Sequence, residues 1–362
     1  MRNVVSQNYQ NQVKIAPVKQ IVQKLKTPSL YYALLDAQGV VAQYSEGVAD
    51  VLTEQLISSN CQYALFSATK TFTAIAILQL QEQQQLNIDD AVAQYLPQYG
   101  FLKNITIRHL LTHQSSINNP LPLSWIHLND ELFDYQGFST HILKQKVKIK
   151  RAPGKKSAYS NLNYLLLGEV IEKASGLTYQ QYIKQRLMRT ITSHNSTISF
   201  QWNVKQRAVG YHPRGSFSSI LLGMFMQSKS YTYKANKKWK AFHPCLVNGS
   251  AYGGLIATPV GVQAYLQALL QNKLLSLESK QMMFTEQKLT NGEYSGKALG
   301  WFTGSLGRQY YVCHAGGGGG FYCEIRIYPK LQKASFVLMN KSGFSDKRLL
   351  DKLDTKVLKI SN

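Results

Sequence analysis

The sequence has few cysteines and no long apolar run. Only four of its 362 residues are cysteine, which is too few for a disulfide-dense scaffold, and their spacing matches no metal-binding motif. The longest apolar stretches, such as 219–226, fall far short of the roughly 20 residues needed to cross a bilayer. The sequence therefore predicts no transmembrane helix and no metal site built on cysteine.

The four cysteines leave one covalent question open. They are Cys61, Cys245, Cys313 and Cys323, and the last two flank a run of glycines. A hairpin there could bring Cys313 opposite Cys323, so a disulfide between them is one alternative. Buried free thiols are the favoured alternative, because free cysteine behaves as a small apolar residue.

Acidic residues are also scarce. The chain has 19 Asp and Glu against 41 Lys and Arg, a formal net charge of +22. Such a field favours polyanionic surroundings, whether nucleic acid, anionic lipid headgroups or an anionic cell-wall polymer. No recognised nucleic-acid-binding motif is present, so we expect no specific nucleic acid partner. With 44% hydrophobic residues the chain can bury a core, and its length suits about two domains or one large one.

The first residues lack the apolar core of a secretory signal. Either the protein stays in the cytoplasm or an export signal has been removed from the sequence. A strongly basic protein suits an anionic cell envelope. We therefore expect a periplasmic or extracytoplasmic location and leave the cytoplasm open.

Sequence periodicity divides the chain into strand-rich ends and a helical middle. Apolar β-rich runs at 30–35 and 40–44 predict a hairpin, and helical spacing dominates from 69 to about 190. The later part predicts a helix at 259–271, strands at 299–304, 309–313, 321–328 and 334–340, and a final helix at 347–360. Hairpins at both ends of a chain favour an antiparallel sheet over a doubly wound one.

These patterns predict three segments. The first, 1–29, is a basic segment with one short helix, and the last, 346–362, is a C-terminal helix that packs on the sheet. Between them, 30–345 forms the main domain, with a sheet subdomain from 30–66 and 255–345 and a mostly helical subdomain from 67–254. Within the latter, 200–244 has no clear periodicity and is predicted to be an irregular insertion.

A serine and a lysine stand three residues apart at the start of a predicted helix. In Ser67-Ala68-Thr69-Lys70 the two side chains share one helix face, so we expect the Lys70 amine beside the Ser67 hydroxyl. A serine hydroxyl needs a neighbouring base to become nucleophilic, and the positive end of the helix dipole favours an alkoxide. The alternative is an N-cap serine followed by a solvated lysine.

A polar triplet, Tyr159-Ser160-Asn161, lies between a turn and another predicted helix. Tyr159 could act as a phenolate base if cations hold down the pKa of its hydroxyl. Asn161 could hold a substrate amide or Lys70. In the alternative interpretation, Tyr159 is a core residue and Asn161 an N-cap.

Five consecutive glycines, 316–320, follow His314 and Ala315 between two predicted strands. Glycines allow the backbone to approach a ligand closely, with N–H groups free to bind an oxyanion. The alternatives are a flexible hairpin turn for the glycines and a hydrogen-bonded strand histidine for His314. A phosphate-binding loop is disfavoured because no Gly-Lys-Ser/Thr follows.

Taken in this order, Ser-x-x-Lys, Tyr-x-Asn and a strand with a glycine motif resemble the serine β-lactamase and penicillin-binding-protein superfamily. The resemblance is closest to its class C β-lactamase-related branch of esterases and D-aminopeptidases, and it covers roughly residues 20 to 345. The supporting segments are 86–90, 95–97, 105–113 and 251–255. Within 105–113, His109 and His113 are expected to be structural. The resemblance implies an α+β fold, in which an antiparallel sheet of terminal strands lies beside an inserted, mostly helical domain.

The resemblance also implies the reaction. Ser67 would be the acylated nucleophile, Lys70 its activating partner, and Tyr159 the general base and the acid for the leaving group. Acyl transfer would pass through an ester on Ser67 that water then hydrolyses. This chemistry needs no metal and no organic cofactor.

By the same resemblance, three residues would bind substrate, namely Asn161, His314 and Gly316. The backbone N–H groups of Ser67 and Gly317 would form the oxyanion hole. All of these stand at positions that match the family's motifs.

One position departs from the penicillin-recognising members, which carry Lys-Thr-Gly where this chain has His314-Ala315-Gly316. A neutral histidine and an alanine methyl supply less charge and no hydroxyl for a substrate carboxylate. We therefore expect a serine hydrolase of the esterase or D-amino-acid peptidase type acting on a small-molecule or peptide acyl substrate. The alternatives are a β-lactamase or DD-carboxypeptidase acting on cell-wall peptides, and a non-catalytic scaffold that binds an anionic cell-envelope polymer. The oligomeric state stays open.

Overall fold

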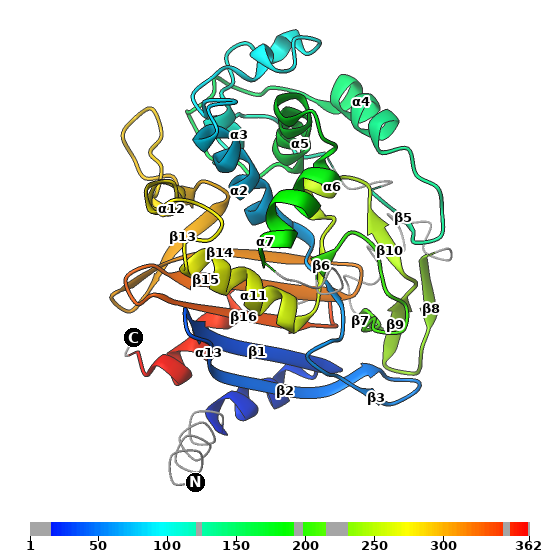
Figure 1. Ribbon diagram of the computed structural model, residues 1–362. Coiled ribbons are helices and arrows are strands. Elements are labelled where there is room, and N and C mark those ends of the chain that lie inside the picture. Colours follow the sequence, from blue (N-terminus) through cyan, green and yellow to red (C-terminus); the bar gives the residue numbers. More distant parts are fainter. Residues whose placement is uncertain (1–15, 121–124, 192–197, 215–230, 343–347, 361–362) are drawn as a thin grey trace.

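A single large antiparallel sheet organises the computed structural model, which describes residues 16–120, 125–191, 198–214, 231–342 and 348–360 (Figure 1). The order of its eight strands is β12-β13-β14-β15-β16-β1-β2-β3, and each neighbouring pair is antiparallel. The strands are β1 (Ser29–Asp36), β2 (Val40–Asp50), β3 (Gln55–Leu56), β12 (Lys297–Ala298), β13 (Trp301–Leu306), β14 (Gln309–Gly318), β15 (Phe321–Tyr328) and β16 (Lys333–Met339).

The two ends of the chain meet in this sheet. β1 pairs with β16 in a register that sets Leu30 opposite Met339. The predicted antiparallel sheet of terminal strands is therefore confirmed, and so is the α+β class. In Figure 1 the helical block lies beside the end of the sheet that carries β13 and β14.

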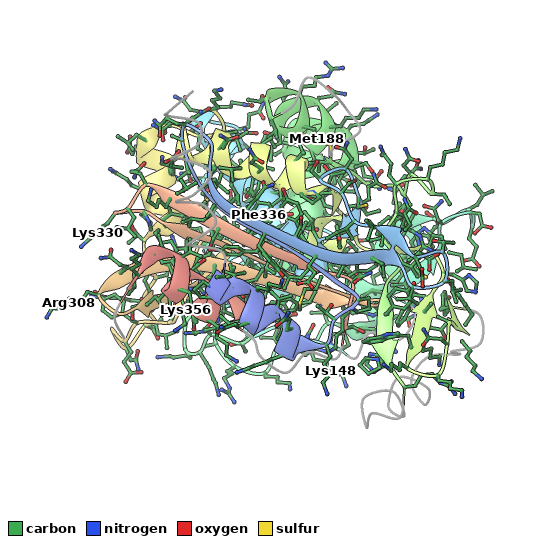
Figure 2. The ribbon with its side chains drawn as sticks, turned by 90° about the horizontal axis from the view of Figure 1, so that it is seen from below. Lys148, Met188, Arg308, Lys330, Phe336 and Lys356 are labelled. Atoms are coloured by element: carbon green, nitrogen blue, oxygen red, sulfur yellow. The ribbon has the colours of Figure 1, made fainter. Side chains whose placement is uncertain are left out.

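Helices cover both faces of the sheet. On one face, a helix at residues 16–25 and α13 (Leu349–Leu358) lie side by side (Figure 2) and share a buried cluster with alternate residues of β1: Leu30, Tyr32 and Leu34. On the other, α11 (Pro259–Leu270) packs with the remaining residues of β1, namely Tyr31, Ala33 and Leu35. Because both faces are covered, β1 is apolar along its length rather than alternating.

The helical block is built around α2 (Thr69–Glu82), in which every side chain from Thr69 to Leu78 is buried. A helix that is enclosed on all sides needs no solvated face, and its polar side chains there, such as Thr71 and Thr73, hydrogen-bond within the protein. Around it lie further helices and turns: η1 (Phe66–Ala68), η2 (Val92–Gln94), η3 (Gly100–Leu102), α3 (Ile107–Leu111), α4 (Tyr135–Lys146), α5 (Asn161–Ser175), α6 (Tyr179–Tyr182), the π-helical η4 (Ile183–Met188), α7 (Arg189–Ile191), α10 (Ser250–Gly253) and α12 (Leu277–Phe284).

Two small sheets join this block to the rest. One has the strand order β4-β11-β6 and the other pairs β10 with β5. Their strands are β4 (Tyr63–Ala64), β5 (Ile126–Leu128), β6 (Ile198–Ser199), β10 (Cys245–Val247) and β11 (Ile256–Ala257). The pairing of β4 with β11 fixes the segment that leads into α2.

The predicted irregular insertion at 200–244 contains a third small sheet, in the order β7-β9-β8. Its strands are β7 (Tyr211–Pro213), β8 (Thr232–Lys234) and β9 (Trp239–Phe242), while 215–230 lie outside the described residues. The sequence did not predict these strands, because three or four residues are too few to show the alternation of apolar and polar side chains that is typical of a strand.

The disulfide alternative is wrong. In the β14–β15 pair, Cys313 lies opposite Arg326 and Cys323 lies opposite Gly316, so the two cysteines are three positions out of register. All four cysteines are free. The flexible-turn alternative for the glycines is also wrong, because β14 continues through Gly318 and only the last two of the five glycines form the turn.

No helix in the described part of the chain is both long enough and apolar enough to span a bilayer. Among the same residues, no three histidine, cysteine, aspartate or glutamate side chains gather closely enough to hold a metal ion.

Candidate active site

Ser67 lies in the turn η1, between β4 and α2. The preceding residue, Phe66, has a φ of 43°, which lies in the left-handed region and is costly for a bulky side chain. Its ring packs on the glycines of β14: an added Cβ at Gly318 or Gly319 would come within 3.1 and 3.0 Å of it. The glycine motif thus supports the sharp turn that presents Ser67 at the start of α2.

Three functional groups meet at the Ser67 hydroxyl. The Ser67 Oγ lies 2.7 Å from the Tyr159 hydroxyl and 3.1 Å from Lys70 Nζ. Lys70 comes from the first turn of α2, three residues after Ser67, as the helical spacing predicts. Tyr159 precedes α5, whose start is fixed by the Ser160 hydroxyl as it accepts the N–H of Leu162.

Lys70 is fully buried and lies among aromatic rings. Its Nζ donates to the carbonyl of Tyr252 at 2.7 Å and lies 5.1 to 5.6 Å from the ring centroids of Tyr159, Tyr164 and Tyr252. Within the described residues it forms no ion pair with a carboxylate. Burial therefore holds the pKa of Lys70 well below its usual range. A neutral amine keeps an N–H for Tyr252 and a lone pair for a proton from Ser67.

Tyr159 has the opposite shift. Burial raises the pKa of its hydroxyl to about 12, and the hydrogen bond with Ser67 offsets only part of this rise. The condition under which Tyr159 would be a phenolate, a pKa lowered by cations, is not met. Its hydroxyl also donates to Asn161 Oδ1 at 3.2 Å, so Asn161 orients Tyr159 in this structure.

The predicted oxyanion-hole strand lies directly against Ser67. An added Cβ at Gly316 would fall 2.0 Å from the Leu65 carbonyl oxygen and 2.9 Å from the backbone N of Ser67, so only glycine fits there. β13 pairs with β14 only as far as Cys313, which leaves the edge of residues 314–318 unpaired on that side. Gly317 is exposed on this edge.

His314 is buried beside the site and carries no charge at neutral pH. Burial, with a smaller contribution from Lys70, lowers the pKa of His314 to about 3. Its Nδ1 lies 2.9 Å from the carbonyl oxygen of Ala315, and its ring meets that of Phe302 edge to face at 5.2 Å. These contacts are those of a hydrogen-bonded strand histidine, which was the alternative to substrate binding.

His109 in α3 and His113 just after it both have structural partners, in line with their expected role. His109 forms a capping box with Thr106. His113 Nδ1 accepts from the Asn163 amide at 3.1 Å, and its ring lies 4.6 Å from that of Tyr159. Burial lowers the pKa of His113 well below its usual range, so the ring that packs against Tyr159 is neutral.

Sequence analysis missed two groups near the site. One is the Tyr252 carbonyl that holds Lys70, although the segment 251–255 was noted for its family resemblance. The other is Lys297 together with Phe302. The Phe302 ring stacks on the Tyr159 ring, with 6.3 Å between the ring centroids. Neither had a local signal, because a carbonyl has no sequence signature and the Lys297–Phe302 contact depends on the pairing of β12 with β13.

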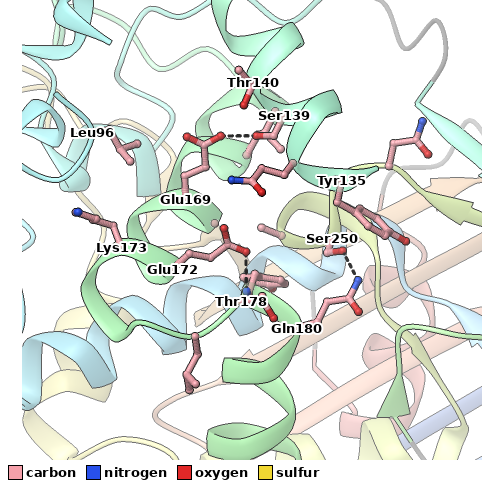
Figure 3. Close-up of a pocket in the computed structure, with 18 of the residues that line it drawn as sticks. Leu96, Tyr135, Ser139, Thr140, Glu169, Glu172, Lys173, Thr178, Gln180 and Ser250 are labelled. Atoms are coloured by element: carbon pink, nitrogen blue, oxygen red, sulfur yellow. Dashed lines mark hydrogen bonds between the residues drawn. The ribbon is translucent and has the colours of Figure 1, made fainter. Parts of the chain in front are cut away.

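A separate cavity of about 770 Å³ lies between α4, α5 and α10 (Figure 3). Its wall includes Glu169, which accepts a hydrogen bond from Ser139, and Glu172, which accepts the N–H of Tyr179. None of Ser67, Lys70 and Tyr159 lines it. It adjoins the site through Ala251, which precedes the residue whose carbonyl binds Lys70.

Comparison with known proteins agrees with this geometry. Residues 16–359 match the family model described as Beta-lactamase. Penicillin-binding protein 4* of Bacillus subtilis is 26% identical over 314 residues, which span 85% of this chain and 67% of that protein. Protein flp of Staphylococcus aureus is 26% identical over 322 residues, 86% of this chain and 59% of flp. The chain thus spans about three fifths to two thirds of these relatives.

Solved structures show the same fold at lower identity. The D-amino acid amidase of Ochrobactrum anthropi SV3, complexed with D-phenylalanine, superposes with a TM-score of 0.79 at 17% identity and covers 97% of this chain and 98% of that one. The likeness therefore extends over the whole sheet and the helical block.

Proposed function

Because this chain belongs to the beta-lactamase family, we propose that it is a serine hydrolase that cleaves an ester, amide or peptide bond through a covalent acyl intermediate on Ser67. One observation carries the proposal: the Ser67 hydroxyl is hydrogen-bonded to a buried amine and to a phenol at 3.1 and 2.7 Å. This is the arrangement of a nucleophile with a neighbouring base and an acid.

In the proposed acylation, the neutral Lys70 amine takes the proton of Ser67 while Oγ forms a bond to the substrate carbonyl carbon. The carbonyl oxygen becomes an oxyanion, for which the backbone N–H groups of Ser67 and Gly317 are the proposed donors. As the leaving group departs, Tyr159 gives it a proton, and the Lys70 ammonium returns one to Tyr159. In this proposal Tyr159 is the leaving-group acid and Lys70 is the base, because burial raises the pKa of Tyr159 and lowers that of Lys70.

In deacylation a water molecule attacks the ester and gives a proton to the Lys70 amine. The bond to Ser67 Oγ breaks, Lys70 returns the proton to Ser67, and the acid product leaves. No residue beyond those at the site is needed to balance the protons. Asn161 would hold Tyr159 in place through both steps.

We propose an ester or a D-amino-acid amide or peptide as substrate rather than a β-lactam. At the His314-Ala315-Gly316 position the imidazole is neutral and turned to the Ala315 carbonyl, so it offers no cation to a β-lactam carboxylate. The structural neighbour is a D-amino acid amidase, which supports an amide as substrate. Cell-wall peptides remain the alternative substrate, and similarity to a penicillin-binding protein keeps β-lactams in the test.

A fluorophosphonate probe tests the catalytic claim. We expect intact-mass measurement to show one adduct on the wild type, mapped to Ser67, and none on Ser67→Ala. Ser305→Ala, which removes an exposed hydroxyl from β13, should label like the wild type. A wild type without an adduct would leave a non-catalytic scaffold as the better interpretation, and an adduct that persists in Ser67→Ala would contradict the claim that Ser67 is the nucleophile.

A substrate panel then ranks the substrates. Aryl esters, D-amino-acid amides, D-Ala-D-Ala peptides and a chromogenic cephalosporin are compared on the wild type and Ser67→Ala. We expect the ester or the D-amino-acid amide to have the highest kcat/KM and the cephalosporin a weak one. A cephalosporin rate far above the others would reverse the ranking.

A further inference from the structure

A lysine outside every sequence motif lies at the wall of the candidate active site. Lys297, in β12, holds its Nζ 3.6 Å from the ring centroid of Phe302 in β13. The same ring also meets the Tyr159 ring, stacked at 6.3 Å, and the His314 ring, edge to face at 5.2 Å. Phe302 therefore contacts both Lys297 and Tyr159, the acid of the proposed reaction.

The charge of Lys297 is not cancelled by an ion pair. Among the described residues no carboxylate forms a salt bridge with it. Burial lowers the pKa of Lys297 to about 8, with smaller opposing effects of Cys313 and Glu286, so most of the lysine is charged at pH 7. The side chain is half-buried, so the ammonium keeps only part of its hydration. A partly desolvated cation with one side on an aromatic ring still has N–H donors for an anion.

The other basic groups around Ser67 are shifted towards their neutral forms. Burial lowers the pKa of His314 to about 3 and holds the pKa of Lys70 and of His113 well below their usual ranges. Lys297 also contributes to the lowered pKa of both histidines, though less than Lys70 does, and its contact with Phe302 places it beside the site. An anionic substrate group that enters beside Tyr159 would meet this ammonium.

We propose that Lys297 is a specificity-determining residue that binds a carboxylate of the acyl substrate, so that the enzyme prefers anionic esters or amides to neutral ones. The inference rests on the proposed serine hydrolase function and names its substrate class. In this inference the substrate carboxylate binds Lys297 in β12. It does not bind at the His314-Ala315-Gly316 position, where the imidazole is neutral.

Kinetics with matched substrates test this inference. 4-Nitrophenyl butyrate is the neutral substrate, and two esters carry a carboxylate, on the acyl side (4-nitrophenyl hemisuccinate) or on the leaving-group side (4-carboxyphenyl butyrate). We expect Lys297→Met to raise KM for one of the anionic esters about tenfold, as for a lost charge-assisted hydrogen bond. Neutral ester turnover should stay within about twofold, and Lys297→Arg should restore the preference.

Lys288→Met is the matched control, because Lys288 carries the same charge, lies on the same segment and also rests on an aromatic ring, that of the exposed Tyr294. It should leave both anionic esters unchanged. The inference is overturned if Lys297→Met has no effect on either anionic KM, if Lys288→Met has the same effect, or if all three esters suffer alike, which would mean a structural role. The proposed function fails separately, if the wild type hydrolyses none of the three esters or if Ser67→Ala still hydrolyses the neutral one.

Discussion

At the residue scale, the proposed acyl transfer depends on the burial of the Lys70 amine. Lys70 lies among three tyrosine rings and lacks a carboxylate partner, so its charged form is penalised in the folded protein. The same burial raises the pKa of Tyr159 to about 12. These opposite shifts, in two groups that share one serine, support the proposal that Lys70 is the base and Tyr159 the acid.

Lys70→Met should therefore separate activity from stability. We expect kcat/KM for an aryl ester to fall by about 10³, within the range for loss of a general base. The melting temperature at pH 7 should rise by a few degrees, roughly what 1 kcal/mol gives in a chain of this size. The pKa of Lys70 is lowered on folding, so the cost of its burial is present at low pH and vanishes above the unfolded pKa of about 10.4. The difference in melting temperature should shrink as the pH rises, and a variant less stable than the wild type at pH 7 would contradict this.

Tyr159 is predicted to remain a phenol throughout the active pH range. The ultraviolet difference spectrum between wild type and Tyr159→Phe should show no tyrosinate band below about pH 10, since the pKa of Tyr159 is raised to about 12. A tyrosinate signal that appears near neutral pH and is lost in the variant would return the role of base to Tyr159.

Local motifs could predict the residues that share a helix or a short turn, and they did so for Ser67, Lys70, Tyr159 and Asn161. Their catalytic roles stay predictions, although the structure brings all four together. The sequence had no signal for the Tyr252 carbonyl or for Lys297. Both reach the site through contacts between segments that are more than 100 residues apart in the chain.

At the element scale, the contact between β14 and the turn η1 holds the nucleophile in place. Gly316→Ala would place a methyl 2.0 Å from the Leu65 carbonyl oxygen, which must move with Ser67. We expect a loss of about 2–4 kcal/mol of unfolding free energy, as for overpacking against backbone, together with a loss of most activity.

Gly317→Ala is the matched control for this prediction. Its added methyl would lie 3.6 Å from the Phe321 carbonyl oxygen, an ordinary contact. We expect this variant to keep the stability of the wild type within about 1 kcal/mol. Equal destabilisation of both variants, measured by urea unfolding, would mean that β14 does not press on η1 as described.

Buried charges attach the C-terminal helix to the sheet. Arg326 in β15 pairs with Glu324 at 2.9 Å and with Asp351 of α13 at 2.7 Å, and it also faces Asp354 at 3.8 Å. Removal of one partner from a buried cluster leaves uncompensated charge, so Arg326→Met should cost about 3–5 kcal/mol.

This cost should depend on pH. Burial raises the pKa of Glu324 to about 7 and also raises that of Asp354, and loss of Arg326 removes a group that lowers both. The carboxyls are neutral at low pH, so the deficit of Arg326→Met in melting temperature should be smaller at pH 5 than at pH 8. Arg308→Met, which removes an exposed charge, is the control. A deficit that grows as the pH falls would contradict this interpretation.

Element prediction succeeded where both the length and the environment of a strand were ordinary. β15 is buried over all eight residues, and its bounds match the predicted strand at 321–328. The sheet at 211–242 was missed because its strands are short and carry lysines. The glycine run was ambiguous for a physical reason: three of its glycines extend β14 because they must lie against η1, and no local preference of glycine indicates a strand.

At the scale of the whole molecule, the net charge of +22 surrounds a site in which burial lowers the pKa of Lys70 and of His314. A field of this sign attracts anionic substrates over long distances, and salt screens it. We predict that kcat/KM for the anionic esters falls when ionic strength rises from about 0.01 M to 1 M, which shortens the Debye length from about 30 Å to about 3 Å. Neutral ester turnover serves as the control, and an equal change in both would assign the effect to the protein's stability.

Trapping of the acyl-enzyme tests the central claim most directly. The wild type and Lys70→Met are mixed with 4-nitrophenyl butyrate, quenched in acid within milliseconds to seconds, and measured by intact mass and peptide mapping. We predict a butyryl adduct on Ser67 that forms and decays in the wild type and forms far more slowly in Lys70→Met. Ester turnover by the wild type with no acyl group on Ser67, or with one on another residue, would contradict the claim that Ser67 is the nucleophile.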